Sequence, residues 1–307
     1  MKTAYLTHPS SLKHNMGTGH PECPARIQAI EDQFIASGLM PLLDRQDAPA
    51  ASKEQLQRAH SIDYIETIFR AAPSNGLAYL DVDTTMNPYS LEAALHAAGA
   101  AVKAVDLVMS GQNENAFCNI RPPGHHAGRS SAAGFCIFNN VAVAASHALA
   151  HYGLSRVAIA DFDVHHGNGT DEIFNGDSRV MLCSTFRHPY YPYAGVDSGN
   201  GHIINVPLAA GATGAQFSAV VTENWLPALE QFKPELLLIS AGFDAHWEDD
   251  MGGLALREED YVWITEKLKR IAIDHANGRI VSVLEGGYAL HALGRSALAH
   301  IKVLNGL

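Results

Sequence analysis

Cysteine is scarce in this 307-residue sequence: there are four, and none belongs to a C-x-x-C pair. Because cysteine-ligated zinc sites and thioredoxin-like redox motifs use such pairs, neither is expected. Three of the four cysteines lie in or beside apolar runs, so we predict small buried thiols there.

Long apolar runs are also missing. The N-terminal residues lack the apolar core of a secretory signal peptide, and no window is long and apolar enough to span a bilayer. We therefore expect a cytoplasmic protein with no membrane partner.

Basic residues are outnumbered by acidic ones, 21 against 32, which gives a formal net charge of −11. A nucleic-acid-binding face is therefore not expected. An acidic surface favours cationic substrates or serves solubility alone, and these two readings stay open.

Short apolar runs alternate with helical patterns along the chain. This alternation predicts an α/β fold of three layers, with a central, mostly parallel sheet and helices on both faces. No repeat or linker interrupts it, so we expect one domain over residues 1–307. The expected strands cover residues 4–7, 116–120, 157–160, 179–184, 203–206, 235–240 and 279–284. The expected helices cover residues 24–37, 61–70, 90–109, 140–152, 217–232 and 258–275, and a short helix closes the chain.

Acidic and histidine side chains follow the buried strand 157–160. Asp163 and His165 are two residues apart, so on an extended chain they face the same side, as does Asp161. Asp244 follows the apolar strand 235–240. Zinc accepts carboxylate and imidazole ligands, and a catalytic site uses three of them with one position open. Solvated loop acids are the alternative, but an acid beside a buried strand is costly without partners.

Two adjacent histidines, His125 and His126, follow the strand 116–120. Imidazole exchanges protons near neutral pH, so one ring can act as a general base while the other orients or stabilises charge. Asp161 and Asn168 are candidates to orient these rings. For an isolated pair, loop histidines bonded to the backbone would be the simpler interpretation.

Three aromatic residues elsewhere in the chain are also candidates for the site. Tyr288 stands on the turn Gly286-Gly287-Tyr288, where its hydroxyl can stabilise an oxyanion or simply pack over the last strand. Phe135 and Tyr191 can wall an apolar slot or belong to the core.

Together these segments resemble the zinc-dependent histone deacetylase family, in particular its class II-like bacterial amidohydrolases. The resemblance implies the arginase/deacetylase α/β fold and hydrolysis of acyl amides on primary amines. It rests on residues 121–127, 134–139, 161–170, 240–245 and 284–288, with His20-Pro21-Glu22 and Arg26.

The resemblance implies a role for each matching position. Asp163, His165 and Asp244 match the zinc ligands. His125 and His126 match the tandem histidines, with His126 the expected general base and acid, and Tyr288 matches the tyrosine that polarises the carbonyl. Substrate-channel positions are matched by Gly134, Phe135 and Tyr191. A potassium site is matched by Asp161, Ser184 and Thr185 with the backbone carbonyls of Asp163 and His165.

Two positions depart from the family pattern. Tyr191 replaces the commoner phenylalanine, and Met251 stands where polyamine-preferring relatives carry a glutamate. The methionine weakens a polyamine reading. Asp81 or Asp83 is expected at the channel rim to bind substrate, and the sequence does not distinguish them.

The sequence therefore predicts zinc-dependent hydrolysis of N-acetyl-lysine-like groups in peptides or proteins, with potassium as a structural ion. The alternatives are an acetylpolyamine amidohydrolase, a catalytically idle acyl-lysine-binding protein and a manganese ureohydrolase of the related arginase fold. Homo-oligomerisation stays open.

Overall fold

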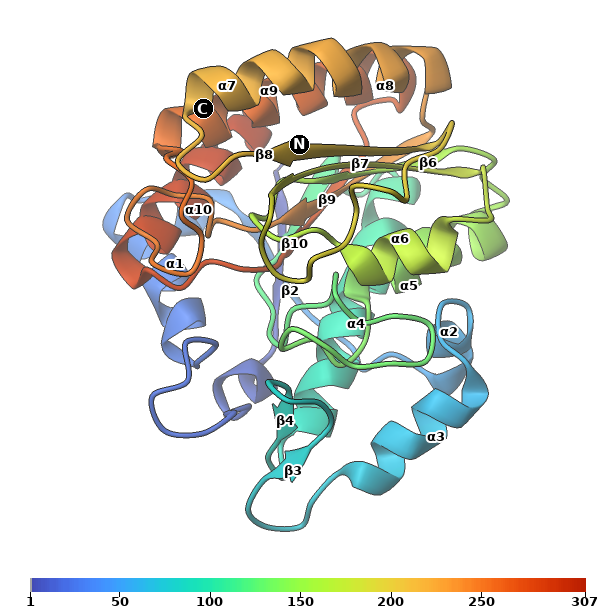
Figure 1. The fold of residues 1–307 in the computed structure, drawn as a ribbon, viewed down its shortest axis with the longest axis vertical. Helices are drawn as coiled ribbons and strands as arrows, with labels where there is room; N and C mark the ends of the chain where they lie inside the picture. The colour runs from blue at the N-terminus through green and yellow to red at the C-terminus, as the bar shows by residue number, and fades with distance from the viewer. Residues whose placement is uncertain (1) are drawn as a thin grey trace.

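The computed structural model describes residues 2–307, and a parallel β-sheet runs through its centre (Figure 1). Its eight strands lie in the order β2-β1-β5-β10-β9-β6-β7-β8, and each neighbouring pair is parallel. The predicted parallel sheet is confirmed. In chain order the strands are β1 (Ala4–Thr7), β2 (Asp44–Asp47), β5 (Asn115–Cys118), β6 (Val157–Asp161), β7 (Val180–Arg187), β8 (Ile203–Leu208), β9 (Leu236–Ala241) and β10 (Ile280–Leu284).

Side chains alternate between two hydrophobic clusters, one on each face of the sheet. In β6, Val157 and Ile159 belong to one cluster, and Ala158 and Ala160 belong to the other. Because successive strand residues point to opposite faces, a strand buried on both sides reads as one apolar run. The first cluster includes α4 (Ser90–Met109) and α5 (Asn140–Tyr152), and the second includes α1 (Ala25–Ala36), α9 (Glu258–His275) and α10 (Leu290–Leu304).

Shorter elements connect these layers (Figure 1). A two-stranded antiparallel hairpin of β3 (Ala78–Tyr79) and β4 (Thr85–Met86) lies outside the main sheet. The remaining elements are η1 (Pro9–Leu12), η2 (Met40–Leu42), α2 (Lys53–Gln57), α3 (Ile62–Ala71), α6 (Asn168–Phe174), α7 (Gly214–Val220), η3 (Val221–Trp225) and α8 (Leu226–Phe232).

The structure differs from the sequence-based prediction in places. The helix expected over 217–232 starts at Gly214, where Thr213 and Gln216 form a capping box, and η3 is a π-helical turn within it. The π-helical turn directly precedes α8, whose second residue, Pro227, has no amide hydrogen to continue the helical hydrogen-bond pattern. The edge strand β2 went unpredicted because its sequence is wholly polar, and α10 is 15 residues long rather than short.

All eight strands point the same way, so their carboxyl ends meet at one edge of the sheet. In open α/β sheets this edge holds the ligand. The loops after β5, β6, β9 and β10 carry the residues described below. Between residues 2 and 307, none of the helices has both the length and the apolar composition that a bilayer crossing requires.

Candidate active site

Asp163, His165 and Asp244 converge at the ends of β6 and β9. Each is buried, and one ligand atom from each lies within 4.8 Å of the others. His165 Nδ1 is 3.0 Å from Asp163 Oδ1 and 3.3 Å from Asp244 Oδ2. Two carboxylates and one imidazole are a donor set that zinc accepts, so these residues fit the ion.

Backbone amides hold the two carboxylates in place. Asp163 accepts hydrogen bonds from the amides of His165 at 2.9 Å and Gly286 at 2.8 Å, and Asp244 accepts one from Val164 at 2.9 Å. Gly286 is required here because a Cβ atom at this position would overlap the carboxylates of Asp163 and Asp244. The turn after β10 therefore closes one side of the cluster.

The cluster is short of positive charge. Burial opposes ionisation of His165, but hydrogen bonds with Asp163 and Asp244 raise its pKa to about 9. Burial and the neighbouring Asp163 carboxylate raise the pKa of Asp244 to about 6. Without a metal, His165 takes up a proton between the acids at neutral pH. A divalent cation would occupy the same place electrostatically.

The tandem histidines have different partners. His125 Nδ1 lies 3.0 Å from Asp161 Oδ2, and His126 Nδ1 lies 2.7 Å from Asn168 Oδ1. Burial opposes a charge on His125, but Asp163 and Asp161 raise its pKa well above its usual value. Burial, His125 and His165 lower the pKa of His126 well below its usual value. His125 is therefore the cationic ring of the pair and His126 the neutral one.

The tautomer of His126 follows from Asn168. An amide oxygen only accepts hydrogen bonds, so Nδ1 carries the ring hydrogen and Nε2 keeps a free lone pair. The neutral ring also lines the adjacent cavity, facing any substrate bound there. His126 thus has the protonation state and the exposure that a general base needs.

A cavity of about 220 Å³ adjoins the cluster, and its walls are largely aromatic. His165 and Tyr288 both line this cavity. The candidate metal ligand and the candidate donor to the oxyanion therefore face the same space. The lining consists of Asp83, His126, Gly134, Phe135, His165, Tyr190, Tyr191, Met251 and Tyr288.

The Gly134-Phe135 turn has an unusual backbone. Both residues have positive φ, 54° and 69°, and for Phe135 this left-handed conformation costs roughly 1–2 kcal/mol. A Cβ atom on Gly134 would overlap the His126 ring, so only glycine allows this approach. The turn places Phe135 edge-on to Tyr288, with ring centroids 5.9 Å apart.

The sequence did not distinguish Asp81 from Asp83 as the substrate-binding acid at the channel rim. In the structure, Asp83 lines the cavity. Its Oδ1 atom accepts a hydrogen bond from the Gly134 amide at 3.2 Å. Asp81 lies outside the lining and accepts one from the Val82 amide at 2.6 Å.

A family match identifies this arrangement. The sequence family described as the histone deacetylase domain matches residues 20–304. The chain belongs to the histone deacetylase family. Membership confirms the predicted family and supports a hydrolase of the deacetylase type.

Relatives and a solved structure agree. The deacetylase is 38% identical over 296 residues to the histone deacetylase-like amidohydrolase of Pseudomonas aeruginosa, an alignment that covers 94% of this chain and 78% of that protein. It is 35% identical to type-2 histone deacetylase 2 of Dictyostelium discoideum, covering 99% of this chain but spanning only 21% of that protein. The crystal structure of the HDA15 HD domain matches with a TM-score of 0.94 at 35% identity, over 99% of this chain and 88% of that one. The predicted arginase/deacetylase fold is confirmed.

Several contacts of the site went unpredicted from the sequence. Tyr190 stacks on His165 at 5.6 Å, and its hydroxyl donates to the Met251 carbonyl at 3.1 Å. Glu285 accepts hydrogen bonds from the amides of Gly124 and His125, and burial raises its pKa to about 7. Only their positions in the sequence could have indicated these two residues: Tyr190 is next to Tyr191, and Glu285 lies within the motif that ends at Tyr288.

Arg26 supports the turn that carries Tyr288. Its guanidinium donates to the carbonyls of Glu285 and Gly287, pairs with Glu22 at 3.1 Å, and lies 5.0 Å from the centre of the Tyr288 ring. Burial raises the pKa of Tyr288, which outweighs the opposite effect of Arg26. The phenol therefore stays protonated and able to donate at neutral pH.

The residues expected around potassium lie side by side in the sheet. Asp161 in β6 pairs with Ser184 in β7, and Thr185 follows. All three are buried, and Ser184 Oγ has no hydrogen-bond partner in the described part of the chain. A potassium ion there stays a prediction.

Proposed function

We propose that this deacetylase hydrolyses the acyl amide of N-acetyl-lysine-like substrates, with one zinc ion held by Asp163, His165 and Asp244. The observation that carries the proposal is that His126, His165 and Tyr288 line one narrow, aromatic-walled cavity. We further propose that residues 1–307 act as one catalytic domain and that Asp161, Ser184 and Thr185 hold a structural potassium ion.

When bound, zinc would polarise the acyl carbonyl and lower the pKa of the attacking water. Nε2 of His126 is placed to take the water proton, because Nδ1 is bonded to Asn168. The Tyr288 hydroxyl would donate to the oxygen that gains negative charge. The histidine pair would then protonate the departing amine, with the His125 cation stabilised by Asp161.

Met251 and Asp83 bear on the choice of substrate. Met251 gives the cavity wall an apolar side chain, with no charge to pair with the free ammonium group of an acetylpolyamine. Asp83 adds a carboxylate that can bind a peptide backbone or attract a cationic amine. We therefore favour acetyl-lysine peptides and keep acetylpolyamines as the second candidate.

The first experiment follows acetate release from an acetyl-lysine peptide. We expect activity to vanish with a chelator and to return with zinc. We expect His126→Ala and Tyr288→Phe to lower kcat by about a hundredfold or more. His291→Ala and Tyr193→Phe, which change exposed residues outside the cavity, should retain wild-type kcat. Near-full turnover by either site variant would refute the assigned roles.

A second experiment separates the candidates. The ratio of kcat/KM for an acetyl-lysine peptide to that for acetylputrescine or acetylspermidine should exceed one. A ratio well below one would favour the polyamine reading. Tight peptide binding without acetate release, with zinc present, would favour an idle binding protein.

A further inference from the structure

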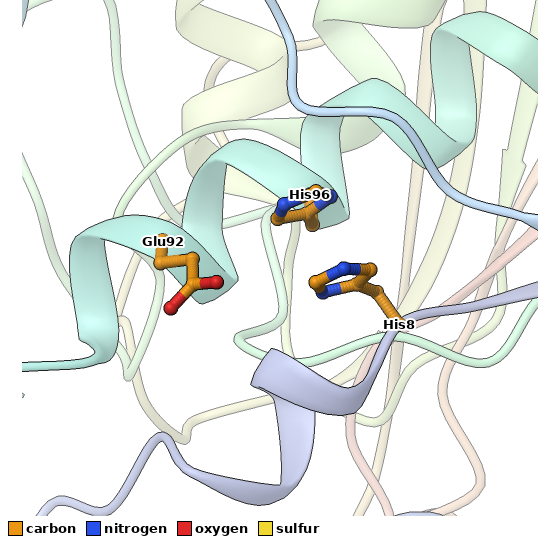
Figure 2. A group of neighbouring side chains, drawn as sticks. All are labelled: His8, Glu92 and His96. Carbon is orange, nitrogen blue, oxygen red and sulfur yellow. The ribbon is translucent and has the colours of Figure 1, made fainter.

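A second group of potential metal ligands lies away from the candidate active site. His8, which follows β1, faces Glu92 and His96 of α4 (Figure 2). One ligand atom from each of the three residues lies within 4.8 Å of the others. None of the three lines the deacetylase cavity, and neither the catalytic nor the potassium proposal uses them.

The helix places two of these ligands on one face. Glu92 and His96 are four residues apart, one turn of α4, so their side chains project to the same side. His8 approaches from the end of β1, and its ring stacks on that of His96 with centroids 3.4 Å apart and planes within 6°. Figure 2 shows the Glu92 carboxylate beside this stacked pair.

Each imidazole is oriented through its Nδ1 atom. His96 Nδ1 lies 2.7 Å from the Ala48 carbonyl, which only accepts, so Nδ1 carries the hydrogen and Nε2 keeps its lone pair. His8 Nδ1 accepts a hydrogen bond from the Ser10 amide at 3.2 Å and lies 2.7 Å from Ser10 Oγ, so in the neutral ring the hydrogen is on Nε2. Binding of a cation at Nε2 would move this hydrogen to Nδ1, where Ser10 Oγ can accept it. Metal-ligating histidines are commonly held by such a bond on the second nitrogen.

The backbone around the cluster is closely packed. A Cβ atom on Gly99 of α4 would overlap the Pro49 carbonyl, so the helix lies directly against the segment after β2. The Ala51 amide also donates to the Leu95 carbonyl at 2.9 Å. This contact fixes Ala48, and through it His96, relative to the helix. The ligands therefore stand on rigid elements, as a metal site requires.

We propose that His8, Glu92 and His96 form a second site for a divalent transition metal, with zinc the first candidate. Two imidazole nitrogens and one carboxylate oxygen suit zinc, nickel, copper or cobalt better than calcium or magnesium. Ligand atoms at about 2.0–2.2 Å from zinc stand roughly 3–4 Å apart. Glu92 is exposed, whereas the stacked rings hold their Nε2 lone pairs in parallel planes, so metal binding requires the His8 ring to tilt out of the stack toward a shared ion.

The metal would join the end of β1 to α4 and leave open positions to solvent. A bound ion would also replace the direct contact of two stacked imidazoles by shared coordination. The site is structural or regulatory in position, because it lies outside the cavity that holds His126 and Tyr288.

The test compares zinc content after dialysis against a buffer of fixed free zinc. Wild-type protein should retain one zinc per chain more than His8→Asn, His96→Asn or Glu92→Gln. His291→Asn, a change of an exposed histidine outside the cluster, should match wild type. Added zinc or nickel should raise the Tm of metal-stripped wild type more than that of the three variants.

Equal zinc content in wild type and all three variants would overturn the proposal. Glu92→Gln guards against a folding artefact, because it alters only an exposed carboxylate, and it should weaken zinc binding at the second site at least about tenfold. The readout is a difference between chains that share Asp163, His165 and Asp244. The expected difference between wild type and variant is therefore one zinc ion per chain, whether or not the catalytic zinc proposal holds.

Discussion

Asp249 holds the backbone of Tyr288: its Oδ2 atom accepts the Tyr288 amide hydrogen at 2.6 Å. The same oxygen accepts from the Ala289 amide at 3.0 Å, and Oδ1 accepts from the Met251 amide at 3.0 Å. One buried carboxylate thus joins the cavity wall at Met251 to the phenol proposed to stabilise the oxyanion.

We expect Asp249→Ala to lower kcat about ten- to a hundredfold, because Tyr288 would lose its position. Three amides would be left without an acceptor, each costing about 1–3 kcal/mol of unfolding free energy if it stays buried. Asp249→Asn keeps an accepting oxygen and should recover part of kcat. Steady-state kinetics and urea unfolding measure the two effects.

Asp250 provides the matched control for Asp249. It is the next residue but is exposed, so Asp250→Ala should leave kcat and stability near wild type. If Asp249→Ala lost stability but kept full kcat in the folded fraction, the carboxylate would support the fold without positioning Tyr288.

Gly134 offers a test of close approach in the cavity. We expect Gly134→Ala to lower kcat/KM about a hundredfold, because the added methyl group would displace the His126 ring. Gly153→Ala is the control: its φ of 66° carries similar strain, but nothing lies within 4 Å of its Cβ position. Both variants should lose Tm, and Gly134→Ala should lose more, because the overlap with His126 adds to the backbone strain. If Gly134→Ala and Gly153→Ala lost the same amount of activity, backbone strain and not displacement of His126 would be responsible.

The sequence predicted those parts of the site that depend on local spacing. Asp163 and His165 are two residues apart after a buried strand, and the structure brings both beside Asp244. The contacts of Asp249 with Tyr288 and of Tyr190 with Met251 join residues 39 and 61 positions apart. No periodicity indicates such partners, because they depend on how loops pack. The polar edge strand β2 was missed for a related reason: it buries too little apolar surface to leave a pattern.

Zinc uptake at the proposed catalytic site should release a proton. Burial opposes the His165 charge, but Asp163 and Asp244 raise its pKa to about 9. In metal-free protein this raised pKa stabilises the fold below about pH 6.5, the unfolded-state value, and the contribution is lost as pH rises through about 9. Zinc requires the neutral ring, so its affinity should rise about tenfold from pH 7 to 8.

This linkage is measured by calorimetry in two buffers of different ionisation enthalpy. The Glu92→Gln background weakens zinc binding at the proposed second site and so reduces its contribution to the measured heat. A binding enthalpy that does not depend on the buffer would mean that no proton is released, and His165 would then already be neutral before the metal arrives.

Asp83 and Asp81 provide the last comparison, since only Asp83 lines the cavity. Asp83→Asn keeps an oxygen for the Gly134 amide but removes the charge that would strengthen a hydrogen bond to substrate. We expect KM for an acetyl-lysine peptide to rise about tenfold, the loss of roughly 1.4 kcal/mol from a charge-assisted bond, with kcat little changed. Asp81→Asn should leave KM unchanged, because its carboxylate is bonded to the Val82 amide outside the lining. If Asp81→Asn raised KM and Asp83→Asn did not, the hairpin of β3 and β4 would have to move on substrate binding so that Asp81 reaches the rim.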